Sequence, residues 1–125
     1  MLNNCDVSAF IATAHGRRAK AFYTNVLGLP LVEDSAAALV FDAHGTMVRI
    51  SKVQQLAPAP YTVLGWSVPD IRAAIEELSN RGVSFERLAG MAQDELGVWT
   101  SPEGNRVAWF KDPDGNTLSL TQFRR

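Results

Sequence analysis

The chain has 125 residues, of which 46% are hydrophobic and 20% charged, with a formal net charge of −1. These values are typical of one globular domain, or of two small halves that share a core. A near-neutral charge with scattered Lys and Arg argues against nucleic acid or an anionic membrane as a partner. No apolar run approaches the roughly 20 residues that span a membrane. The lone Cys5 cannot form an internal disulfide, and no export signal is recognised, so we expect a cytoplasmic protein.

The first half of the sequence predicts one helix and four strands. Residues 7–13, VSAFIAT, are short and apolar, as in a buried strand. A helix is expected over 15–28, because Ala19, Phe22, Tyr23 and Val26 recur at helical spacing and Gly28 suits a left-handed cap. Three further strands are expected, over 31–33, 38–42 and 46–52, with a hairpin turn at 43–45.

The second half repeats this order. A strand is expected over 62–68 and a helix over 69–82, with Pro69 and Asp70 at its start and Gly82 at its end. The helix should bury one apolar stripe, formed by Ile71, Ala74, Ile75 and Leu78. Four strand candidates follow, over 83–88, 98–101, 106–111 and 116–122.

The two halves can be superposed as sequences. A shift of fifty-five positions places His15 on Asp70 and Tyr23 on Leu78, and the cap glycines match after a deletion of one residue. We therefore predict an internal duplication of a βαβββ unit within a single domain. Module one covers residues 6–54, a proline-rich connector covers 55–60, and module two covers 61–122.

Two motifs carry a resemblance to a known family. FYTNVLGL at 22–29 and FKDPDGNTLSL at 110–120, in this order and at this spacing, resemble the vicinal oxygen chelate superfamily. That group includes glyoxalase I, extradiol dioxygenases and bleomycin-resistance proteins, and the resemblance covers about residues 6–122. It implies an α+β fold in which two βαβββ modules form a curved mixed sheet, an open cup with helices on its convex face. It also implies a homodimer.

The resemblance identifies four positions that hold a divalent metal in the family's enzymes, which use His, Gln or Glu there. Matched one by one, these positions are Ser8, Arg49, Val63 and Ser119. Serine hydroxyls are poor ligands, valine supplies no donor atom, and arginine adds a permanent positive charge. We therefore expect neither a metal nor another cofactor at this site.

Strand alternation indicates which side chains line the cup, because every second residue faces the same way. The candidate ligand contacts are Ser8, Phe10, Met47, Arg49, Val63, Trp109 and Ser119. Arg49 suits a carboxylate or phosphate, although it could instead pair internally with Asp42 or Glu86. The loop around 86–98 could be a lid over the cup, an ordinary packed segment or a dimer contact.

These features favour a metal-free binding protein of the glyoxalase/bleomycin-resistance type. Its expected partner is a small, partly apolar, anionic molecule. The alternatives are a lyase-like or dioxygenase-like enzyme with unconventional metal ligands or none, and a regulatory module that has lost its ligand. No residue is assigned a catalytic role.

Overall fold

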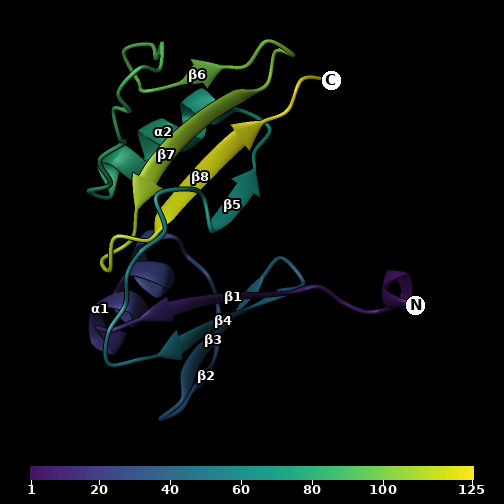
Figure 1. Ribbon diagram of the computed structural model, residues 1–125, viewed down its shortest axis with the longest axis vertical. Coiled ribbons are helices and arrows are strands. Elements are labelled where there is room, and N and C mark those ends of the chain that lie inside the picture. The colour runs from purple at the N-terminus through teal and green to yellow at the C-terminus, as the bar shows by residue number, and fades with distance from the viewer. The chain divides into compact units, whose positions relative to one another are not determined.

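The computed structural model describes residues 1–125, which form two compact units, Met1–Ala57 and Pro58–Arg125. The boundary lies within the predicted connector. Each unit combines helical segments with a four-stranded mixed sheet (Figure 1), which confirms the predicted α+β class. No helix in the chain combines the length and the apolar character that crossing a membrane requires.

The first unit follows the predicted βαβββ order. Its elements are a short 3-10 turn η1 (Leu2–Asn4), β1 (Ser8–Thr13), α1 (Gly16–Ala21), the π-helical segment η2 (Phe22–Val26), β2 (Leu31–Asp34), β3 (Ala38–Ala43) and β4 (Thr46–Lys52). The sheet order is β1-β4-β3-β2, with β1 parallel to β4 and the other pairs antiparallel. The two neighbours β3 and β4 are joined by the predicted hairpin, in which His44 and Gly45 both have positive φ.

The helix of the first unit widens before it ends. In η2 the Leu27 amide donates to the Phe22 carbonyl at 3.0 Å, which spans five residues rather than the four of an α-helix. The turn closes at Gly28, whose φ of 74° is the left-handed conformation expected there. Beyond it the Leu29 amide donates to the carbonyl of Tyr23, a fully buried residue whose ring packs on Phe41 of β3.

The second unit contains β5 (Leu64–Ser67), α2 (Ile71–Asn80), β6 (Trp99–Thr100), β7 (Arg106–Lys111) and β8 (Thr117–Gln122), in the sheet order β5-β8-β7-β6. The Asp70 carboxylate caps α2 by accepting from the Ala73 amide at 3.1 Å, as the sequence indicated. Ile71 and Ile75 are buried on the predicted stripe, and α2 packs against β7 and β8.

One strand prediction is wrong, because residues 83–88 form only a single bridge, between Phe85 and Phe110. The Glu86 amide also reaches β7, where it donates to the Trp109 carbonyl at 2.8 Å. The remaining edge of β7 is occupied by β6, through the pair Trp99 and Val107. Two short segments therefore share the edge that a single strand fills in the first unit.

The ladder registers show that the two units are built alike. Phe10 is the partner of Arg49 across β1 and β4, and Gly65 is the partner of Ser119 across β5 and β8. Gly65 lies fifty-five positions after Phe10, so the predicted duplication agrees with the pairing. The sheet face opposite these residues forms the core, where the predicted Val48, Ile50, Leu118 and Leu120 are all buried.

Candidate functional site

Three rows of side chains cross one face of the first sheet. Each row takes residues that are partners across β3, β4 and β1, so its members point to the same side. From the hairpin inward the rows are Asp42, Met47 and Ser8; then Val40, Arg49 and Phe10; then Ala38, Ser51 and Ala12. The structure thus brings together the four candidates of the first module, as strand alternation predicted.

This face exposes large apolar side chains around a single arginine. Phe10 is 65% exposed and Met47 is 46% exposed, while Arg49 is half-buried between Phe10 and Val40. Neither of the two carboxylates considered as internal partners of Arg49 forms an ion pair with it. Asp42 accepts from the Gly45 amide at 2.9 Å, and Glu86 pairs with Lys111 Nζ at 3.7 Å. This arrangement favours ligand binding by Arg49 over internal pairing.

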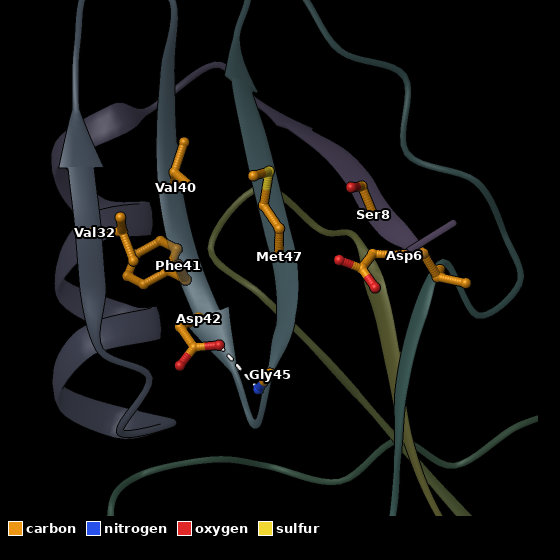
Figure 2. A pocket seen from close by; sticks show the side chains of 9 residues that line it. Asp6, Ser8, Val32, Val40, Phe41, Asp42, Gly45 and Met47 are labelled. Carbon is orange, nitrogen blue, oxygen red and sulfur yellow. Dashed lines mark hydrogen bonds between the residues drawn. The ribbon is translucent and has the colours of Figure 1, made fainter. Parts of the chain in front are cut away.

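A cavity of about 330 Å³ lies at the hairpin end of the same face (Figure 2). It is lined by Asp6, Val7, Ser8, Val32, Val40, Phe41, Asp42, Gly45 and Met47. Only Ser8 and Met47 among these were predicted as ligand contacts. Asp6 could have been found from strand parity, since it lies two residues before Ser8, and Asp42 from its place beside the hairpin turn.

The equivalent face of the second sheet is smaller and better packed. Gly65, Ser119 and Trp109 form its central row, and Ser119 is only 5% exposed. A Cβ atom at Gly65 would lie 2.8 Å from Ser119 Oγ, so the glycine makes room for the serine. Val63 lies just before β5, where its amide donates to the Thr117 carbonyl at 2.9 Å.

A second tryptophan lies in the neighbouring row of the same face. Trp99 is the partner of Val107, which faces the same way as Trp109, and the two indole rings have centroids 6.2 Å apart. Sequence reasoning did not assign Trp99 to the site. The sequence did predict a strand over 98–101. Side-chain alternation along that strand would have placed Trp99 on the same face as Trp109 once its pairing with β7 was known.

The registers also test the equivalence of the four positions that hold metal in the superfamily's enzymes. Arg49 and Ser119 occupy the same place in their sheets, and so do Ser8 and Val63, whose partners are Met47 and Thr117. The matching of positions therefore agrees with the geometry within each unit. The meeting of all seven candidates in one cup stays a prediction.

These residues do not fit a divalent metal. Two hydroxyls, a guanidinium and an isopropyl group supply no carboxylate, imidazole or thiolate. No group of three or more His, Cys, Asp or Glu side chains is placed to hold an ion elsewhere in the chain. The two histidines lie apart from these rows, His15 at the start of α1 and His44 in the hairpin turn.

The loop over 86–98 is held by its own hydrogen bonds. The Gln93 side chain accepts from the Leu88 amide at 2.7 Å and donates to the carbonyls of Glu86 and Gly97 at 2.9 and 2.8 Å. Asp94 Oδ1 accepts from two further amides of the loop. This bonding favours the packed-segment interpretation over a lid.

Comparison with known proteins identifies the family. Residues 7–120 match the Glyoxalase/Bleomycin resistance protein/Dioxygenase superfamily, which is most of the chain. The protein therefore belongs to this superfamily, as its motifs indicated. A search of curated proteins finds no match.

Solved structures of the superfamily have the same fold. A member from Sphaerobacter thermophilus DSM 20745 is 26% identical, with a TM-score of 0.74 over 98% of this chain and 100% of that one. Lactoylglutathione lyase from Agrobacterium tumefaciens is 13% identical, with a TM-score of 0.75 over 95% and 93%. TnmS3, an antibiotic-binding protein from Streptomyces sp. CB03234, is 22% identical, with a TM-score of 0.71 over 97% and 98%.

Proposed function

We propose that the protein binds a small, partly apolar molecule on these sheet faces without a metal ion. The observation that carries this proposal is the residue set at the four equivalent positions, Ser8, Arg49, Val63 and Ser119. The ladder registers support the matching within each sheet, and none of the four side chains is a good ligand for a divalent metal. Binding without turnover requires only shape, apolar contact and a few polar groups.

The ligand has an anionic group that pairs with Arg49. A guanidinium makes two parallel, charge-assisted hydrogen bonds to a carboxylate or phosphate. Phe10 and Met47 flank Arg49 and offer apolar contact, and Trp109 offers an aromatic surface on the second sheet. Proteins with this fold include both a binding protein, TnmS3, and an enzyme, the Agrobacterium lyase.

Metal analysis combined with thermal unfolding tests the proposal. Purified protein should contain no stoichiometric metal, and added Zn²⁺, Mn²⁺ or Ni²⁺ should not raise its melting temperature. A small aromatic acid at about 100 times its dissociation constant should stabilise the fold by about 2.7 kcal/mol. Arg49→Gln should abolish this shift, while Arg18→Gln, on the exposed surface of α1, should leave it intact. A bound, stabilising metal would instead favour the lyase-like or dioxygenase-like alternative.

We further propose that the protein is a homodimer of the reducing cytoplasm. The first sheet exposes Val7, Phe10 and Val32 at 76%, 65% and 65%, an apolar surface that a second copy would cover. The thiol of Cys5 is free and exposed, which suits a reducing compartment.

A further inference from the structure

The cavity at the hairpin end of the first sheet has apolar walls and only negative charges. Its charged lining residues are Asp6 and Asp42, and no Lys, Arg or His lines it. Val32, Val40 and Met47 supply much of the apolar surface. A volume of about 330 Å³ lies at the lower end of the range found for small-molecule sites, roughly 300 to 1,000 Å³.

The two carboxylates line the cavity from separate segments of the first unit. Asp42 is the partner of Met47, Met47 is the partner of Ser8, and Asp6 lies two residues before Ser8. Figure 2 shows Asp6 and Asp42 on either side of Met47. Asp42 uses Oδ1 for the Gly45 amide, so its Oδ2 and the exposed Asp6 carboxylate remain available to a donor.

We propose that this cavity recognises the cationic end of an amphiphilic molecule, a protonated amine joined to an apolar body. This inference rests on the proposed function, because it assigns a ligand class to the same sheet face. An ammonium group donates a charge-assisted hydrogen bond to Asp6 or to Oδ2 of Asp42, and the apolar body covers Val32 and Met47. Burial of apolar surface favours such contact whatever the charge of the end group.

The neighbouring row contains Arg49, so it adds a positive charge to the surface that a ligand would contact. Arg49 lies two residues beyond Met47 on β4, about 6.6 Å along the strand. A molecule that contacts both rows therefore carries a cation at the hairpin end and an anion one row inward. Zwitterionic amphiphiles with a short separation between their charges fit this pattern.

Three probes that differ only at one end test the assignment: 4-phenylbutylamine, 4-phenylbutanol and 4-phenylbutanoate. Fragments of this size bind weakly, so titrations followed by NMR of the Met and Val methyl groups are the suitable measurement. The amine should shift the methyl signals of Met47 and Val32 and bind about tenfold more tightly than the alcohol. Its affinity should fall as salt is added, because exposed charges are screened.

The matched variant is the double substitution Asp6→Asn with Asp42→Asn. Asparagine keeps an oxygen acceptor for the Gly45 amide, so the hairpin should fold as before. The double variant should lose about tenfold in affinity for the amine and none for the alcohol. Glu103→Gln, an exposed site in the second unit, should change neither affinity.

The outcomes separate this inference from the proposed function. Equal binding of amine and alcohol, or an amine affinity unchanged in the double variant, overturns the cationic subsite. Binding of the acid that is lost in Arg49→Gln would still support the proposed function in that case. If none of the three probes shifts the methyl signals, both the subsite and binding on this face are wrong.

Discussion

Gly65 and Ser119 pack tightly against each other at the centre of the candidate site face of the second sheet. The missing Cβ of Gly65 would lie 2.8 Å from Ser119 Oγ and 3.3 Å from the Ser119 carbonyl oxygen. Its backbone conformation is an ordinary strand, so the need for glycine here comes from space. The pair explains why this part of the face presents little side-chain bulk.

Gly65→Ala is expected to destabilise the fold by about 1–3 kcal/mol, because it overpacks a buried contact. Urea denaturation measures the change in the free energy of unfolding. Adding Ser119→Ala should recover part of the loss, since it removes the nearer clash and leaves only the carbonyl contact. Full stability of Gly65→Ala alone would show that Ser119 can move aside at no cost.

Asp34 joins two lysines at the end of β2. Its carboxylate accepts from Lys52 Nζ at 2.7 Å and from Lys20 Nζ at 3.1 Å. The hydrogen bond from Lys52, followed by that from Lys20, lowers the pKa of Asp34 below its ordinary value of 3.8. A lowered pKa in the folded state means that these contacts stabilise the fold above the unfolded pKa.

The contribution of Asp34 should be lost as the pH falls through the depressed pKa. Asp34→Asn is therefore expected to be less stable than the wild type near neutral pH, and the difference should close between about pH 5 and about pH 2. Urea unfolding at several pH values measures this. Glu33→Gln, exposed on the same strand, serves as control. A gap that persists at low pH would assign the loss to something other than the charge.

At the scale of elements, the sequence was informative wherever local chemistry decides the structure. The strand 46–52 was predicted to the residue, and Asp70 and Gly82 bound the second helix as capping chemistry requires. Residues 83–88 have strand composition yet form one bridge, because β6 already occupies part of the edge of β7. Whether a segment pairs as a strand depends on how much of the neighbouring strand's edge is still unpaired, and composition does not encode this.

The candidate site was only partly predictable for the same reason. Alternation placed Ser8 and Met47 correctly on one face, because parity is a local property of a strand. The cavity walls from β2 and β3 depend on how neighbouring strands curve around the hairpin. Asp6, which lines the cavity, precedes β1, so it could be placed only by extending the alternation of that strand backwards by two residues.

Gln93 is expected to organise the loop over 86–98. Gln93→Ala removes the acceptor for the Leu88 amide and the donor to two carbonyls, so that amide should exchange with solvent much faster. Hydrogen exchange measures the effect directly. The loss of stability should be about 0.5–1.5 kcal/mol, the usual net contribution of a hydrogen bond, because these groups are exposed or only partly buried. Unchanged exchange at Leu88 would mean that the loop does not depend on this side chain.

At the scale of the whole molecule, each unit has an amphipathic sheet with one buried face. The opposite face of the first sheet remains strongly apolar, with Phe10, Val32 and Met47 all exposed. Exposed apolar surface of this kind is typical of an interface. The proposed homodimer would remove part of this surface from water, and the proposed ligand would cover the cavity beside Met47.

Sedimentation is expected to give the mass of a dimer at micromolar concentration. Phe10→Ser should shift the equilibrium toward the monomer, because it removes a large apolar contact, whereas Val53→Ser, exposed beyond β4, should have little effect. A wild-type monomer would overturn the homodimer. A dimer unaffected by Phe10→Ser would place the interface elsewhere.

The π-helical turn η2 marks a difference in length between the helix ends of the two units. Tyr23 and Leu78 are equivalent residues, and the carbonyl of each closes its helix. The Tyr23 carbonyl accepts from Leu29, six residues on, whereas that of Leu78 accepts from Val83, five residues on. The first unit therefore has one residue more than the second between these points. The widened turn accommodates this extra residue within the helix end, and the pairing of β1 with β4 matches that of β5 with β8 although the segments that follow the two helices differ in length.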